Sequence, residues 1–110
     1  MLATLTALAE PNRLRILELL RTGPRPVGEI SERLKMRQPQ VSKHLQHLKN
    51  AGLVVVHPLA QQRVYEVRAA PLAELHAWTE KFRELWADRL DALEDVIDSI
   101  QKKETKRKRK

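Results

Sequence analysis

The most informative hydrophobic pattern in this 110-residue chain lies in residues 38–53, QPQVSKHLQHLKNAGL. Val41, Leu45 and Leu48 are spaced by four and three residues, so on a helix they form one apolar stripe that must face a core. Pro39 suits the first helical position, and Gly52 suits the left-handed residue just beyond a helix end. The pattern therefore predicts a short amphipathic helix over residues 39–51.

The opposite side of this predicted helix is polar. It carries amide, hydroxyl, ammonium and imidazole groups, on Gln40, Ser42, Lys43, Gln46, His47 and Asn50. Groups of these kinds contact base edges and phosphates in DNA. Because any surface helix has a polar face, the neighbouring elements must decide between a DNA-reading helix and an ordinary one.

The segments before this helix predict a helix-turn-helix unit. Residues 11–20, PNRLRILELL, read as a core helix opened by a proline, and residues 22–26, TGPRP, break it. Residues 27–34 repeat apolar side chains at steps of three and four, and Lys35 to Gln38 form a tight connection to the next helix. Two short helices joined by about four residues are typical of the helix-turn-helix motif.

The segments after the helix predict a β-hairpin. The β-branched runs at residues 53–59 and 64–68 flank a polar tip at residues 60–63, and Pro58 must lie at a strand end or an edge. A hairpin directly after a helix-turn-helix is a wing, whose tip residues Gln61, Gln62 and Arg63 suit the DNA backbone or the minor groove. For Arg63 alone, an ordinary solvated cation is the alternative. The predicted fold class is mainly α with a small β-hairpin wing, a winged helix-turn-helix.

A long apolar row in residues 71–102 predicts one helix with more hydrophobic surface than its own domain can cover. Three of the four aromatic residues stand on it at steps of four, and large anchors of this kind are enriched where subunits meet. An intramolecular core stripe is the alternative. We favour a two-fold dimer through the terminal helices, with residues 1–9 joining in. The expected interface residues are Leu2, Leu5, Leu75, Trp78, Phe82, Leu85, Trp86 and Leu93.

From Leu93 the row continues as a heptad-like seam, LEDVIDSI, compatible with continued helix pairing. A two-fold dimer would place two reading helices one DNA turn apart, so the expected operator is an imperfect palindrome.

Charge is unevenly distributed along the chain. Residues 1–68 hold 11 Lys and Arg against 5 Asp and Glu, residues 69–104 hold 5 against 9, and the last six residues add 5 positive charges. The basic part coincides with the predicted helix-turn-helix and wing, where cations would neutralise phosphates and make binding steeply salt-dependent. The acidic part is expected to face away from DNA.

Composition limits the remaining possibilities. The chain contains no cysteine, which excludes disulfides and thiolate metal sites. It also lacks a long apolar run and a basic leader, so a cytoplasmic protein without a membrane partner is expected. One domain is expected over residues 1–104, followed by a disordered basic tail, residues 105–110, which either reaches flanking DNA phosphates or only aids solubility. No catalytic constellation and no cofactor site is apparent. The competing function is a winged helix used for protein contacts.

Three stretches together resemble the ArsR-type winged-helix repressors: residues 9–20, AEPNRLRILELL; residues 27–54, VGEISERLKMRQPQVSKHLQHLKNAGLV; and residues 62–67, QRVYEV. The resemblance implies that Gln38, Gln40, Ser42, Lys43 and His44 enter the major groove and that Arg63 is the wing contact. The helical wheel disagrees in part, because it places His44 only about 60° from the buried stripe.

The chain departs from the metal-sensing members that it resembles. The stretch PVGEIS stands where many carry a cysteine pair. Glu74 and His76 could mimic two ligands of a zinc site on the last helices, but about ten residues later the chain has Leu85, Trp86 and Ala87. Because zinc takes three or four protein ligands, no metal site is predicted, and a repressor using His and carboxylate ligands is the alternative.

Overall fold

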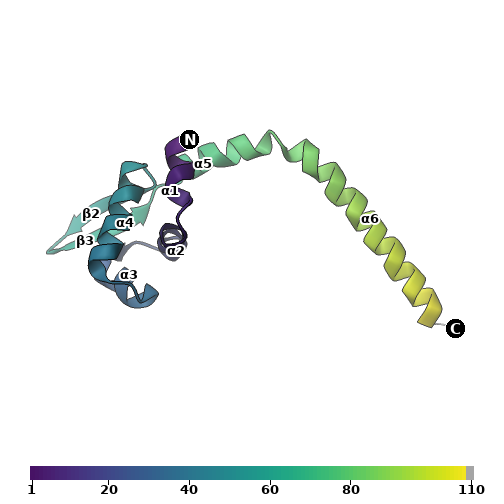
Figure 1. Ribbon diagram of the computed structural model, residues 1–110, viewed down its shortest axis with the longest axis horizontal. Helices are drawn as coiled ribbons and strands as arrows, with labels where there is room; N and C mark the ends of the chain where they lie inside the picture. Colours follow the sequence, from purple (N-terminus) through teal and green to yellow (C-terminus); the bar gives the residue numbers. More distant parts are fainter. Residues whose placement is uncertain (109–110) are drawn as a thin grey trace. The chain divides into compact units, whose positions relative to one another are not determined.

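The computed structural model describes residues 1–108, with side chains up to residue 104. It contains six helices and three strands in this range (Figure 1): α1 (Leu2–Leu8), α2 (Pro11–Leu20), β1 (Arg25–Pro26), α3 (Val27–Leu34), α4 (Gln38–Asn50), β2 (Val54–Leu59), β3 (Gln62–Val67), α5 (Ala69–Glu80) and α6 (Arg83–Lys108). They form two compact units, Met1–His76 and the residues from Ala77 onward. The first is mainly helical with a small antiparallel sheet, which confirms the winged helix-turn-helix prediction.

The core of the first unit forms where four helices, α1 to α4, and the sheet meet. The apolar stripe of α4 is completely buried, as its spacing predicts, since Val41, Leu45 and Leu48 are each 0% exposed. They pack in one cluster with side chains from the other elements: Ala7, Ile16, Leu17, Leu20, Ile30, Leu53, Val54 and Tyr65. Burying each large aliphatic side chain contributes roughly 1.5–3 kcal/mol relative to exposure. This cluster therefore fixes which face of α4 points outward.

Local hydrogen bonds set the ends of the helices in the helix-turn-helix. Pro11 opens α2, and Glu10 caps it, because its Oε2 accepts the Arg13 N–H at 2.9 Å. Helix α3 ends at Lys35, whose backbone is left-handed at φ 56°, and the Met36 N–H donates to the Ser31 carbonyl at 3.1 Å. The chain therefore turns sharply and starts α4 three residues after Lys35.

Helix α4 ends in a Schellman turn that leads directly into the wing. The Gly52 N–H donates to Lys49 O at 2.9 Å, the Leu53 N–H donates to Leu48 O at 2.9 Å, and Gly52 has the positive φ of 77° that the motif needs. Leu53 and Leu48 are both fully buried, which supplies the hydrophobic contact that accompanies this turn.

The sheet differs from the predicted hairpin in two ways. It has three strands in the order β1-β3-β2, because Arg25 and Pro26 pair with Tyr65 and Val64. The sequence marked these two residues only as a breaker, since a two-residue strand is too short to show alternation. The hairpin tip is also shorter than predicted: Gln62 and Arg63 already lie in β3, opposite Leu59 and Pro58, and only two residues turn.

The predicted single helix over residues 71–102 is wrong, because the structure has two helices, α5 and α6, separated by a turn at Lys81–Phe82. The N–H groups of Lys81 and Phe82 donate to Trp78 and Thr79 three residues back, at 3.2 and 3.0 Å, instead of four residues back. Trp78 and Phe82 stack edge to face at this tightened turn, with ring centroids 5.0 Å apart. No proline or glycine stands there to indicate a break.

Both outer ends of this region extend beyond the predicted limits. Helix α5 starts at Ala69, with Pro71 in its first turn, where proline is tolerated. The backbone of α6 is helical to Lys108, so it continues into the segment predicted to be disordered, in keeping with the good helix propensity of Lys and Arg. Residues 109–110 of that predicted tail lie outside the described residues. Within residues 1–108, no helix is both long and apolar enough to cross a bilayer.

Candidate nucleic-acid interface

The face of α4 opposite its buried stripe presents polar side chains to solvent. Six of the predicted DNA contacts on this helix are exposed: Gln38, Gln40, Ser42, Lys43, Gln46 and His47. In the described part of the chain, no hydrogen bond or ion pair engages the side chains of Gln40, Ser42 and Lys43. Their donors and acceptors are therefore available to another molecule.

The first turn of α4 lies beside the wing. Gln38, Gln62 and Arg63 line one hollow of about 450 Å³ together with the start of α3. A Cβ built on Gly28 would lie 3.7 Å from Gln38 Nε2, so the Gln38 side chain reaches the first turn of α3. The structure thus brings Gln38 together with two predicted contacts, Gln62 and Arg63, that lie more than 20 residues later in the sequence.

An ion-pair network holds α3 behind this hollow. Glu29 Oε1 pairs with Arg25 on β1 and with Arg33 Nε at 3.1 Å, so one carboxylate joins the short strand to two turns of α3. The guanidinium of Arg25 also donates to Thr22 Oγ1 at 2.8 Å. Arg25 and Arg33 therefore have charged or polar partners within the domain, whereas Lys43 is unpaired.

Further along α4, Gln46 has an internal partner. Its Nε2 donates to Asn50 Oδ1 at 2.9 Å, one helical turn away, and both side chains are exposed. The bond restricts the rotamers of Gln46, so the amide is partly oriented before any ligand arrives.

His47 lies towards α1 and not towards the wing. It lines a hollow of about 420 Å³ with Asn50, Arg13 and residues of α1 that include Leu2. The predicted contacts on α4 thus extend from Gln38, which lies beside the wing, to His47, which lies beside α1.

His44 differs from the other predicted contacts, because its side chain is only 15% exposed. Its Nδ1 is buried and lies 3.7 Å from Oε2 of Glu10, the capping residue of α2, which is too long for a hydrogen bond. This placement agrees with the helical wheel, and the major-groove role that the resemblance implies for His44 stays a prediction.

Two cations next to the interface were missed by the sequence reasoning. Lys35 and Arg37 are exposed in the turn between α3 and α4, and Arg37 is the N-cap residue of α4. The signal was present, since both cations fall within the four-residue connection of the predicted helix-turn-helix.

The predicted dimer residues are outside the core. Leu2 and Leu5 are exposed on α1, and Leu75 is partly buried. In the second unit, Trp78, Phe82, Leu85, Trp86 and Leu93 are all exposed.

The two candidate metal ligands are far from a complete site. Glu74 Oε1 lies 3.5 Å from the amino group of Met1. Among the described residues, no three His, Asp or Glu side chains gather in a way that could hold a metal ion.

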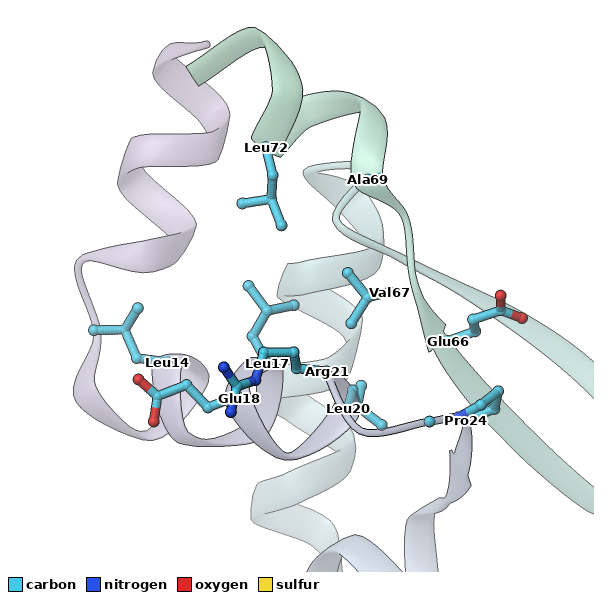
Figure 2. A pocket seen from close by; sticks show the side chains of 11 residues that line it. Leu14, Leu17, Glu18, Leu20, Arg21, Pro24, Glu66, Val67, Ala69 and Leu72 are labelled. Atoms are coloured by element: carbon cyan, nitrogen blue, oxygen red, sulfur yellow. The ribbon is translucent and has the colours of Figure 1, made fainter. Parts of the chain in front are cut away.

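An apolar hollow of about 460 Å³ lies on another side of the first unit, between α2, β3 and the start of α5. Figure 2 shows Leu17, Val67 and Leu72 pointing toward one another across it. None of the predicted DNA contacts lines this hollow.

The buried stripe, the exposed polar helix and the adjoining hairpin define a winged helix-turn-helix protein. Comparison with known proteins gives the family. Residues 10–56 match the family described as "Bacterial regulatory protein, arsR family". The HTH-type transcriptional regulator Rv2034 of Mycobacterium tuberculosis is 39% identical over 93 residues, which cover 84% of each chain. The chain belongs to the ArsR family of transcriptional regulators.

Two further proteins similar to this chain are described as a repressor and as a homodimeric DNA-binding domain. The transcriptional repressor SdpR of Bacillus subtilis is 32% identical over 76 residues, which cover 69% of this chain and 84% of that protein. A solution structure described as the homodimeric winged helix-turn-helix DNA-binding domain of Mb0332, from Mycobacterium bovis, has a TM-score of 0.62 and 32% identity. It covers 74% of this chain and 76% of that chain.

Proposed function

We propose that this ArsR-family regulator is a cytoplasmic, non-enzymatic repressor that binds an imperfectly palindromic operator as a homodimer. The observation that carries the proposal is the division of α4 into two faces, one completely buried and one polar and exposed beside the wing. An exposed amide-rich helix of this kind suits the major groove, because Gln and Asn side chains form paired hydrogen bonds with adenine.

The contacts divide by chemistry. Gln40 and Gln46 are assigned to base edges, and Ser42, Lys43 and His47 to the backbone or flanking bases. Gln38, Gln62 and Arg63 form the wing side of the interface, where the shared hollow supports a joint contact with one stretch of backbone. Lys35 and Arg37 are added as phosphate contacts. His44 is assigned a positioning role against Glu10, because its imidazole faces its own domain.

The homodimer is proposed to form through α1 and the C-terminal helices. Its support is the exposure of large apolar side chains on both elements, together with the homodimeric description of the Mb0332 domain. Exposed apolar groups of this number are typical of an interaction surface. We propose no metal-sensing role, since the chain lacks cysteine and no His and carboxylate groups gather as a ligand set among the residues that the structure describes.

One experiment tests the DNA-binding role. Binding of the purified chain to a duplex from upstream of its own gene, and to a scrambled duplex of equal length, is measured at increasing salt. We expect preferential binding of the upstream duplex, with affinity that falls steeply as salt rises. Equal affinity for both duplexes at every salt concentration would contradict the proposal and favour the protein-adaptor function.

A further inference from the structure

Helix α2 carries a cation without a partner, Arg13. The residue is partly buried, and its Nε is buried with no hydrogen-bond partner. Among the side chains that the structure describes, none pairs with this guanidinium, because Glu10, three residues earlier, accepts the backbone N–H of Arg13 at 2.9 Å instead. Partial burial of a charge without a partner is unfavourable. A negative group from another molecule would remove this cost.

Arg13 shares a hollow with the last turns of α4. Together with His47 and Asn50, it lines the hollow of about 420 Å³ beside α1. Asn50 Oδ1 accepts the hydrogen bond from Gln46, so the amide nitrogen of Asn50 is its free end. None of the described residues that line this hollow is an Asp or a Glu. The hollow therefore combines guanidinium, imidazole and amide donors without a negative side chain, which suits an anion.

We propose that this hollow binds one phosphate of the DNA backbone, with Arg13 as the principal ligand and His47 and Asn50 beside it. The assignment rests on the proposed DNA-binding function and adds to it a contact from α2, a helix that supplies none of the predicted DNA contacts. Arginine suits this role, because its guanidinium can donate two parallel hydrogen bonds to one phosphate.

The hollow lies at the end of α4 where a DNA backbone is expected to pass. The exposed row of α4 runs from Gln40 to Asn50 in steps of three and four residues. The helix has 13 residues and is therefore about 20 Å long, whereas the major groove is about 12 Å wide. A helix that crosses the groove with the middle of its row on base edges thus brings its two ends to the two bordering backbones. The wing lies beside one end of α4, and Arg13 lies beside the other.

The salt dependence of DNA binding by the full chain tests this assignment. Each lost phosphate contact lowers the slope of log affinity against log salt by about 0.9, so we expect Arg13→Gln to lower it by about 1.8 in a dimer. Operator and scrambled duplexes should weaken by the same factor. Arg13→Lys, which keeps the charge, should retain the slope. Arg21→Gln is the matched control, because it removes a cation from the C-cap of the same helix, in the hollow that none of the predicted DNA contacts lines.

Thermal unfolding separates a phosphate ligand from a structural arginine. Because the guanidinium has no described partner to lose, Arg13→Gln should not lower the melting temperature of the free chain. Arg13→Met, which buries no amide, replaces it in every measurement if Arg13→Gln does not fold. A lowered melting temperature for both variants, with an unchanged salt slope, would show a structural role and overturn the assignment.

Neutral phosphate analogues distinguish a DNA phosphate from a free anion. A methylphosphonate, which lacks the charged oxygen, replaces each phosphate of the operator duplex in turn. At one position in each half-site, it should weaken binding of the original chain several-fold and have little effect on Arg13→Gln, because the two changes remove the same interaction. If no position distinguishes the two chains, the hollow does not bind the backbone.

The remaining outcomes separate this assignment from the proposed function. Equal salt slopes for the original chain and Arg13→Gln, with the preference for the operator intact, would remove Arg13 from the DNA contacts and leave the proposed function standing. A raised dimer dissociation constant in sedimentation with an unchanged slope would show that a second copy covers the hollow, which also overturns the assignment. No preference for the operator in the original chain would refute both.

Discussion

Replacing Gln46 with alanine separates base recognition from stability. In the free protein, the only described partner of the Gln46 side chain is Asn50, at 2.9 Å on the exposed face of α4. An exposed pair one helical turn apart contributes about 0.2–0.5 kcal/mol to helix stability, and alanine has the better helix propensity. We therefore expect Gln46→Ala to change the free energy of unfolding by less than about 0.5 kcal/mol.

The effect on DNA recognition should be much larger. A paired contact from a glutamine to adenine gives about 1–3 kcal/mol of discrimination against other bases, and a two-fold dimer makes the contact twice. The preference for operator over scrambled DNA should thus fall by about 2–6 kcal/mol, which is at least about 30-fold in the ratio of dissociation constants.

Fluorescence anisotropy at one fixed salt concentration measures this ratio, with an operator duplex selected from a random pool by the original protein. Asn50→Ala is the matched control, because it removes the same internal hydrogen bond and leaves the Gln46 amide in place. Its loss of preference should be the smaller one. If Gln46→Ala weakens both duplexes equally, or lowers the unfolding free energy by more than about 1 kcal/mol, the assignment of Gln46 to a base edge is wrong.

Three other substitutions test neighbouring parts of the reasoning. Lys43→Gln should reduce the slope of log affinity against log salt by about 0.9 per copy on all duplexes, and an unchanged slope in salt titrations would remove Lys43 from the phosphate contacts. Leu45→Ala should lower the unfolding free energy by roughly 2–5 kcal/mol in urea denaturation, since Leu45 is 0% exposed; a loss below 1 kcal/mol would mean that the stripe of α4 is not packed as described. Lys35→Gly should raise the melting temperature, because it relieves left-handed backbone strain of about 1 kcal/mol at this position. Lys35→Ala, which keeps a Cβ, is the control. A lowered melting temperature for Lys35→Gly would contradict the left-handed conformation.

Periodicity alone predicted most of the first unit, because its helices each bury one face against a single core. The stripe on α4 is the clearest case, with every member completely buried. The wing was predicted from its β-branched runs, but Gln62 and Arg63 are polar and exposed on both sides of the strand, so no alternation marked them as part of it.

Other features depended on contacts that a single segment does not reveal. Strand β1 exists only because residues 25–26 lie beside β3. The break at Lys81–Phe82 lies in an uninterrupted apolar row, so the spacing predicted one helix. For the site, the wheel indicated that His44 lies near the buried stripe, but only the fold shows that Glu10, 34 residues earlier, is the group it faces.

The Schellman turn at Gly52 has a mechanical consequence. It joins the last residue of α4 to the first residue of β2 through three residues, one of them buried between the same side chains as the helix. Helix α4 and the β2–β3 hairpin are thus held as one rigid body and change orientation together. When α4 enters the DNA groove, the hairpin is already oriented towards the neighbouring DNA. Little further conformational entropy is therefore lost when the hairpin binds.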